Sequence, residues 1–506
     1  MKAKKLTALL LASAMAASMV AGCSSGSGKE TEAATAALQE TEADKQKSAD
    51  AGWTGEITFF AKEYTPAEPN DINPNPPKKL REYADEYEQA HPGVTIKFVE
   101  LPGDVVMNEY IRTQAAAKQL PDITFINYAA VGSQLPKEMF TDLAPYFEKE
   151  DPYVEGTKWG DTFNDAVLQM IQNGDGGYYT VSADYVETGI YYNKAMFEKA
   201  GITETPKNWE EFMEVCQKLK DADLVPLAWS MAQDDTYAMG WTNRVFLSNC
   251  YADMMDQIDV DGVKGVNAME KAAAYKNGVV KVDDGKFLSY FDALKNLVPY
   301  MNESWASKTD LEKKFMQEEV AMYWTGSWLP KKMTDAGVDF EYDSFPFPTP
   351  TKNTCPPYST DAVTSGAVGG PSGSFQYSVS SEAANKTMSP EKLDVVMDWL
   401  MYITEPSRVS EIVNEYGSFC PTIKGSVPAE GMEGLMANLN ADYVNFDGGQ
   451  ELTGTVSDTT FRYLHQYMLG EVTMDEVIEA LTDTMDEEVE ASIEDNPDWE
   501  IDKYLK

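Results

Sequence analysis

Among the residue types that can act as catalysts or metal ligands, the acidic ones are abundant and the histidines are rare. The chain has 83 Asp and Glu residues but two histidines, His91 and His465, which leaves little room for imidazole-based acid–base or metal chemistry. Beyond residue 26 no G-x-S-x-G, H-E-x-x-H or G-x-x-x-x-G-K-[ST] motif occurs, so the usual nucleophile, zinc and phosphate signatures are missing from the rest of the chain. Paired carboxylates could serve a surface glycoside hydrolase, but among so many acids such pairs are inevitable and discriminate nothing.

Composition narrows the class of partner. The 506 residues include 41 Lys and Arg, so the net charge is −42. This acidity argues against binding nucleic acid, whose phosphates would be repelled, and against a basic patch on anionic lipid. The length predicts two or three domains, and 43% hydrophobic residues are enough to form large cores.

The N-terminus indicates export. Residues 1–5 are basic and residues 6–20 are apolar, as in a signal peptide. The ending Val20-Ala21-Gly22-Cys23 resembles a bacterial lipobox, which implies a signal peptide over 1–22 and a lipid on Cys23. An ordinary secretory signal with a chance cysteine is the alternative. Residues 23–53 are predicted to form a disordered tether, and no later stretch has the roughly 20 apolar residues needed to span a bilayer.

Four cysteines remain after the signal peptide, and none forms a C-x-x-C pair. One of them lies on the apolar face of a predicted helix. Free buried thiols are therefore expected in preference to a disulfide. The four residues are Cys216, Cys250, Cys355 and Cys420.

The first part of the mature chain alternates strands and helices. Apolar runs at 56–60, 94–99 and 120–126 predict strands, and amphipathic segments at 78–90 and 110–118 predict helices between them. Because helices connect successive strands, this order indicates a largely parallel α/β sheet.

The most informative stretch is 176–230. Within it a β-rich run at 188–192 ends at Asn193, which can cap a helix that stops at Gly201. A second helix is predicted from Asn208, with Glu211 placed for a capping box. Its apolar face consists of Trp209, Phe212, Val215, Cys216 and Leu219.

In this order the signals resemble a block of the bacterial extracellular solute-binding proteins (family 1) that serve sugar importers of the ABC class. The segment Phe315–Trp328 resembles a second block of that family, with Glu318 in place of its usual glycine. Weaker matches occur at 119–122 and 345–348. The resemblance covers 56 to about 492, nearly all of the mature chain.

The resemblance implies an α/β, two-lobed periplasmic-binding-protein-like fold with hinge strands and a central ligand cleft. Lobe 1 would comprise 54–185 and 345–405, and lobe 2 would comprise 186–344 and 406–506. The first crossing between lobes is expected at 181–188, and the segment 345–348 is expected to return the chain to lobe 1.

The implied function is capture of a carbohydrate by hinge closure and delivery to ABC permease subunits. The many aromatic residues favour an oligosaccharide, because each stacked sugar ring needs its own platform. The protein would be a monomer without cofactor, metal or nucleic acid, held by Cys23 at the extracytoplasmic face of the membrane. The alternative is a lipoprotein that keeps the fold as a partner or signalling subunit and binds no sugar.

The candidate ligand-binding residues sit where strands end and loops face the implied cleft. Trp328 comes first, because related binders use an aromatic residue near this glycine turn as a sugar platform. Core packing is the competing explanation for every aromatic residue, and for Tyr191 and Tyr192 it is the preferred one. The other candidates are Trp229, Trp241, Asn127, Trp324, Glu63, Tyr64, Tyr128, Asp234, Asp235, Tyr237, Gly369 and Gly370.

Overall fold

The structure, a computed structural model, describes most of the chain. The signal segment, Cys23, Cys355, Asp234 and Asp235 lie outside the described residues. The described residues are 53–69, 76–101, 105–132, 134–232, 237–260, 265–354, 368–370, 373–439 and 446–506.

The first lobe is built on a mixed five-stranded sheet in the order β2-β1-β3-β10-β4. Strand β1 (Gly55–Phe60) runs parallel to β2 (Val94–Phe98) and to β3 (Ile123–Phe125), as predicted. Strand β10 (Gln376–Val379) is antiparallel to β3 and to β4 (Val181–Ser182). The sheet is therefore parallel at β2, β1 and β3. Strand β10, which comes from a distant part of the chain, is antiparallel to both of its neighbours.

Helices pack around this sheet and bury their apolar faces against it. In α2 the buried residues are Leu80, Tyr83, Ala84 and Tyr87, the face that the sequence predicts. The helices of this lobe are α2 (Lys79–Ala90), α3 (Met107–Ala116), α4 (Ala144–Phe147), α5 (Trp159–Thr162), α6 (Asp165–Ile171), α15 (Pro390–Ile403) and α16 (Pro406–Tyr416).

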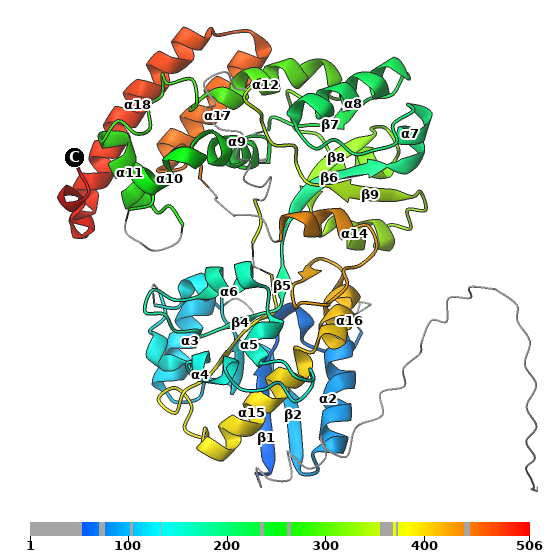
Figure 1. Ribbon diagram of the computed structural model, residues 1–506, viewed down its shortest axis with the longest axis vertical. Helices are drawn as coiled ribbons and strands as arrows, with labels where there is room; N and C mark the ends of the chain where they lie inside the picture. The colour runs from blue at the N-terminus through cyan, green and yellow to red at the C-terminus, as the bar shows by residue number, and fades with distance from the viewer. Residues whose placement is uncertain are drawn as a thin grey trace, which may run out of the picture. The chain divides into compact units, whose positions relative to one another are not determined.

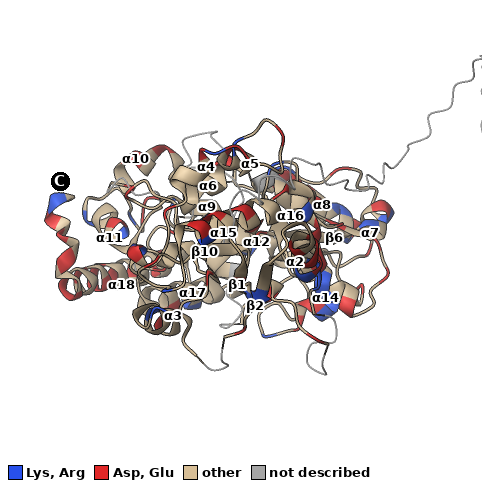
Figure 2. Ribbon diagram, turned by 90° about the horizontal axis from the view of Figure 1, so that it is seen from below, with Lys and Arg blue, Asp and Glu red and all other residues tan. Residues whose placement is uncertain are grey.

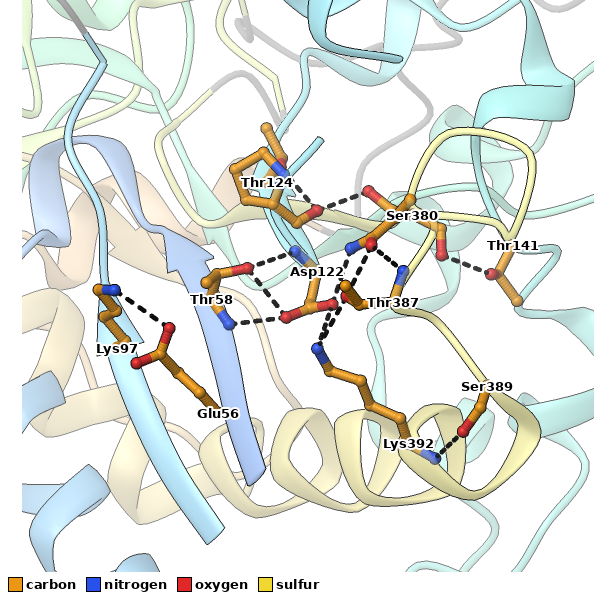
Figure 3. Close-up of polar contacts among 12 residues, drawn as sticks. Glu56, Thr58, Lys97, Asp122, Thr124, Thr141, Ser380, Thr387, Ser389 and Lys392 are labelled. Carbon is orange, nitrogen blue, oxygen red and sulfur yellow. Dashed lines mark hydrogen bonds and ion pairs between the residues drawn. The ribbon is translucent and has the colours of Figure 1, made fainter. Parts of the chain in front are cut away.

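One buried carboxylate joins three elements of the first lobe (Figure 3). Asp122, just before β3, accepts hydrogen bonds through Oδ2 from the amide and the hydroxyl of Thr58 on β1, at 2.8 and 2.9 Å. Its Oδ1 lies 2.8 Å from Nδ2 of Asn385 and 2.7 Å from Nζ of Lys392 on α15. Because an unpaired buried charge is costly, the lysine and these donors are needed together.

The second lobe contains a four-stranded sheet in the order β7-β8-β6-β9. Its centre is β6 (Thr188–Asn193), which is antiparallel to β8 (Met322–Gly326) and β9 (Tyr342–Phe345). Strand β7 (Leu227–Ala228) is parallel to β8. All of β8 is buried, which fits its run of apolar and small residues.

The two helices after β6 confirm the predicted caps. Asn193 Oδ1 accepts from the amide of Met196 and starts α7 (Lys194–Lys199). Asn208 Oδ1 accepts from the amide of Glu211 and starts α8 (Trp209–Asp221). The Glu211 carboxylate reaches the amide of Lys207 at 2.9 Å, so the reciprocal bond of the expected capping box is displaced by one residue.

The remaining helices pack on the second lobe, and the longest is α18 (Met474–Asp495). It begins with a capping box between Thr473 and Glu476 and buries Val477, Leu481, Met485 and Val489. The others are α9 (Thr242–Cys250), α10 (Met255–Ile258), α11 (Ala268–Lys276), α12 (Ser289–Leu297), α13 (Leu311–Met316), α14 (Leu329–Asp335) and α17 (Gly454–Leu469).

A short ladder lies between the lobes, where β5 (Asp184–Tyr185) pairs with β11 (Cys420–Pro421) (Figure 1). Backbone hydrogen bonds between Val186 and Gly370 add a further connection. Three separate parts of the chain thus meet at the crossing predicted near 181–188.

Two segments pack differently from the sequence-based division into lobes. Phe345 belongs to β9 and Phe347 lies in the core of the second lobe, so the chain has not yet returned to the first lobe at 345–348. Val409 and Ile412 of α16 lie in the core of the first lobe, although the sequence assigns 406–506 to the second. The apolar face of α16 needs a partner, and α2 provides one.

The distribution of charged side chains and the state of the cysteines can be compared with what the composition predicts. Acidic side chains occur along α18, whereas basic residues gather at α14 (Figure 2). Cys216, Cys250 and Cys420 are buried and none of them is in a disulfide, as predicted. Within the described ranges, no helix combines the length and the apolar character required to cross a bilayer.

Candidate functional site

Four tryptophans from separate parts of the second lobe lie in one continuous cluster. Trp229 follows β7, Trp324 lies in β8, Trp241 precedes α9 and Trp328 precedes α14. The ring centroids are 6.3 Å apart between Trp229 and Trp324. They are 5.4 Å apart between Trp324 and Trp241, and 6.3 Å apart between Trp241 and Trp328. The structure therefore brings together the four tryptophans that the sequence singles out.

The cluster has a buried and an accessible part. Trp229 and Trp324 are each only 3% exposed, and the Trp324 ring stacks on Phe347 with centroids 3.7 Å apart. Trp241 and Trp328 are partly exposed. The two buried rings thus form a foundation, and the other two can present their faces to a ligand.

Gly326 allows Trp328 to lie over the end of β8. A Cβ atom at this position would be 2.0 Å from the Trp328 ring, far inside van der Waals contact. This explains the glycine two residues before the tryptophan: any side chain there would displace the indole.

The crossing supports the cluster from one side. The Trp324 indole Nε1 donates to Oγ1 of Thr188 at 3.3 Å, and the amide of Ser327 donates to the carbonyl of Glu187 at 2.8 Å. The side chains of Asp184 and Glu187 are completely buried. Burial raises the pKa of Asp184 to about 6 and that of Glu187 to about 7, while their hydrogen-bond donors act in the opposite direction.

The candidate residues of the first lobe differ in how exposed their side chains are. Asn127 is exposed and uses its Oδ1 to cap the turn at Tyr128–Ala130, where Tyr128 is partly buried. Glu63 is exposed and accepts from the hydroxyl of Tyr416 at 3.2 Å. Tyr64 is fully buried, and its hydroxyl donates to Oδ2 of Asp184 at 2.7 Å. Tyr64 therefore supports the crossing and offers no face to a ligand, because its ring completes the core of the first lobe.

The glycine candidates Gly369 and Gly370 lie against the backbone of the crossing. A Cβ on Gly369 would lie 1.8 Å from the carbonyl oxygen of Val186, and Gly370 exchanges two backbone hydrogen bonds with Val186. Tyr237 begins the π-helical turn Tyr237–Trp241 that carries Trp241. Asp234 and Asp235 lie outside the described residues.

Sequence reasoning missed the support behind the cluster. Asp184 and Glu187 were not among the candidates, and Phe347 was assigned to a returning segment. Two acids three residues apart in the segment Val181–Thr188, which has no other charged residue, were the available signal, because buried acids need dedicated partners.

A groove of about 840 Å³ lies elsewhere, where α14 and the start of β9 face the end of α16. Both charges occur along it, for example Lys331, Asp335 and Glu415, and Lys331 pairs with Asp335 at 2.8 Å. None of the candidate ligand-binding residues whose side chains the structure describes lines this groove.

Comparison with known proteins places the chain in a family. The pattern of the bacterial extracellular solute-binding proteins matches residues 82–438, which is more than half of the chain. The chain therefore belongs to the bacterial extracellular solute-binding protein family.

Curated relatives match over shorter stretches. The chain is 33% identical over 138 residues to the Escherichia coli protein YcjN, which is named as an ABC transporter periplasmic-binding protein; this covers 27% of this chain and 30% of that one. It is 24% identical over 286 residues to the multiple sugar-binding protein of Streptococcus mutans, covering 53% and 59%. The matches thus span less than two thirds of these relatives.

Solved structures match over almost their whole length. The apo-form of RafE from Streptococcus pneumoniae has a TM-score of 0.60 at 17% identity, covering 86% of this chain and 98% of that chain. A chitin oligosaccharide binding protein has a TM-score of 0.51 at 19% identity, covering 86% and 99%. At these identities the likeness concerns the fold, which is the two-lobed fold expected from the sequence.

Proposed function

We propose that this protein is the substrate-binding lipoprotein of an ABC importer. It captures a carbohydrate, and an oligosaccharide in particular, by closing its two lobes about the crossing near Asp184–Thr188, and it delivers the sugar to the permease subunits. The observation that carries the proposal is the cluster of Trp229, Trp324, Trp241 and Trp328.

The cluster suits a sugar because of how its rings are held. A pyranose ring has flat C–H faces that stack on indole, and hydroxyl groups that need hydrogen-bond partners. The planes of Trp241 and Trp328 are inclined by 55°, so one flat sugar ring cannot lie on both. Two differently oriented platforms fit two successive sugar units, which favours an oligosaccharide over a monosaccharide.

Names of similar proteins support the same class of ligand. The Streptococcus mutans relative is named a multiple sugar-binding protein, and a solved structure similar in fold is that of RafE in complex with raffinose. The YcjN relative is named for ABC transport. These proteins bind solutes and are not named as enzymes, so the proposal contains no turnover step.

The site of action follows from the family and the N-terminus. Extracellular solute-binding proteins work outside the cytoplasm, and a lipid on Cys23 would hold this one on the membrane beside its permease. Residues 23–53 would then serve as the tether. Exposed side chains of the first lobe, such as Asn127 and Glu63, are available to bind sugar hydroxyls when the lobes close.

A thermal-shift screen tests the proposal. The protein is produced without residues 1–22 and with Cys23→Ser, and is heated with raffinose, chito-oligosaccharides, malto-oligosaccharides and their monosaccharides. A ligand at a hundredfold its dissociation constant adds about 2.7 kcal/mol of stability, so an oligosaccharide should raise the melting temperature more than its monosaccharide does.

Two outcomes would contradict the proposal. No shift with any carbohydrate would favour the partner or signalling subunit, which keeps the fold without binding sugar. Release of reducing ends from a bound oligosaccharide would instead show a hydrolase.

A further inference from the structure

Two fully buried carboxylates, Asp184 and Glu187, lie on the crossing. Asp184 and Glu187 lie three residues apart, where the chain passes from the first sheet to the second. Burying a charge without a cation at contact distance is unfavourable, so both groups need several donors.

The partners of Asp184 face the first lobe. Its Oδ2 accepts from the Tyr64 hydroxyl at 2.7 Å and from the amides of Ser374 and Phe375 at 2.8 and 2.9 Å. Tyr64 and Phe375 both belong to the core of that lobe. Asp184 therefore fixes the returning chain at its entry into the first lobe.

The partners of Glu187 face the second lobe. Its Oε1 accepts from the amide of Thr188 at 2.7 Å and from the amides of Val368 and Gly369 at 3.3 Å each. Its Oε2 accepts from the hydroxyl of Tyr185. Because Val368 belongs to the core of the second lobe, Glu187 holds the returning chain there before it reaches the crossing.

Glu187 is also connected to two tryptophans of the cluster, in each case through one intervening residue. Its carbonyl oxygen accepts from the amide of Ser327, the residue before Trp328. Thr188, whose amide it binds, accepts from the indole of Trp324. Asp184 has no such connection among its hydrogen bonds described here.

We propose that Glu187 is a positioning residue that couples the hinge to the tryptophan cluster. Its carboxylate holds the segment 368–369 against the crossing and so fixes Thr188 and Ser327, which in turn orient Trp324 and Trp328. Loss of the negative charge loosens the segment and weakens ligand binding. The statement about the ligand rests on the proposed function, whereas the coupling is a property of the ligand-free protein.

The charge of Glu187 depends on pH in the neutral range. Burial raises its pKa to about 7. Among the described residues, the titratable groups that interact with it include Tyr185 on β5, whose hydroxyl donates to it, and Cys420 on β11; Asp184 lies three residues earlier in the chain. Burial, together with the charges of Glu187, Asp184 and Glu433, raises the pKa of Cys420 well above its usual range. A protonated Glu187 offers the amides a neutral acceptor, which binds them less strongly than the carboxylate does.

The test uses the ligand-free protein first. Tryptophan fluorescence of the wild type is followed from about pH 5.5 to about pH 8.5, a range that brackets the raised pKa. We expect a transition near pH 7 that Glu187→Gln abolishes and that the matched control Asp184→Asn retains. A transition near pH 7 that persists in Glu187→Gln with an unchanged midpoint would overturn the coupling, whereas the titration of Asp184 is expected near pH 6.

Hydrogen exchange on the wild type needs no substitution. Peptides containing Val368 and Gly369, corrected for the intrinsic pH dependence of exchange, should exchange about three- to tenfold faster at about pH 6 than at about pH 8, the effect of losing about one net hydrogen bond. Equal corrected rates would overturn the proposal even if Glu187→Gln failed to fold.

Binding separates this proposal from the proposed function. If raffinose or another oligosaccharide binds the wild type, Glu187→Gln should bind it about three- to tenfold more weakly. Equal affinities would reject the coupling and leave the proposed function intact. If no carbohydrate binds but Glu187→Gln abolishes the fluorescence transition, the proposed function fails and the coupling stands.

Discussion

The ammonium group of Lys392 lies 2.7 Å from Oδ1 of Asp122, and the two side chains are only 6% and 1% exposed. The pair joins α15 to the start of β3, and Thr58 connects the same carboxylate to β1. Charge pairing in the core thus aligns elements of the first lobe that are distant in sequence.

Replacing Lys392 should destabilise the first lobe strongly. Lys392→Met keeps the length of the side chain but leaves the Asp122 charge without its cation, and breaking a buried pair costs about 3 kcal/mol or more. Urea denaturation measures the loss. Lys97→Met is the control: its pair with Glu56 is 55% and 47% exposed and should contribute at most about 1 kcal/mol. Equal losses in the two variants would show that the buried pair has no special role.

Removing the Trp328 ring should weaken ligand binding without unfolding the protein. Trp328→Ala deletes a partly exposed stacking face, and we expect a loss of about 1–3 kcal/mol in calorimetric titration with the oligosaccharide found in the screen. Trp499→Ala is the control, because it also removes an indole from the second lobe. Trp499 lies beyond the end of α18, packs against the core of that lobe and is not part of the tryptophan cluster. Unchanged affinity in Trp328→Ala would remove this residue from the site.

Adding a methyl group at Gly326 should displace Trp328. Because the added Cβ would lie 2.0 Å from the indole, Gly326→Ala should cost about 1–3 kcal/mol of stability through overpacking and should also lower ligand affinity. Gly174→Ala is the control, since nothing lies within 4 Å of its added Cβ. Wild-type melting and affinity in Gly326→Ala would mean that the indole can move freely.

The buried carboxyl of Asp184 should make stability depend on pH. Its pKa is raised from 3.8 to about 6 in the folded protein, so the folded state binds the proton more tightly than the unfolded state does. This contribution is present below about pH 4 and is lost as the pH rises through about 6. Asp184→Asn should therefore gain stability relative to the wild type over that interval, on the order of 3 kcal/mol.

Urea denaturation at several pH values checks this expectation. The control is Asp165→Asn, whose side chain is 81% exposed and should show no comparable pH-dependent difference. A stability difference between Asp184→Asn and wild type that does not vary with pH would contradict the assigned direction.

Local signals in the sequence were reliable wherever neighbouring residues determine the structure. The caps at Asn193 and Asn208, the buried face of α8 and the strand at 188–192 depend on contacts within a few residues, and all are found. The displaced bond of Glu211 shows the limit: the residue type predicts a capping carboxylate, but side-chain geometry selects which amide it binds.

Long-range pairing decided the rest. The antiparallel β10 could not be foreseen from the strand–helix order of the first lobe, and the place of α16 depends on its contact with α2. Tyr64 follows β1 in a position that predicts exposure, but the buried Asp184, 120 residues away, takes its hydroxyl.

The sequence by itself determined the α/β class, because apolar periodicity and caps are local properties of the chain. Its resemblance to the solute-binding proteins supplied the two-lobed fold and the candidate tryptophans. Only the tertiary structure decided that Trp229 and Trp324 are a buried foundation while Trp241 and Trp328 remain accessible. It alone placed Glu187 behind them, because the burial of a side chain depends on segments that the sequence keeps more than a hundred residues apart.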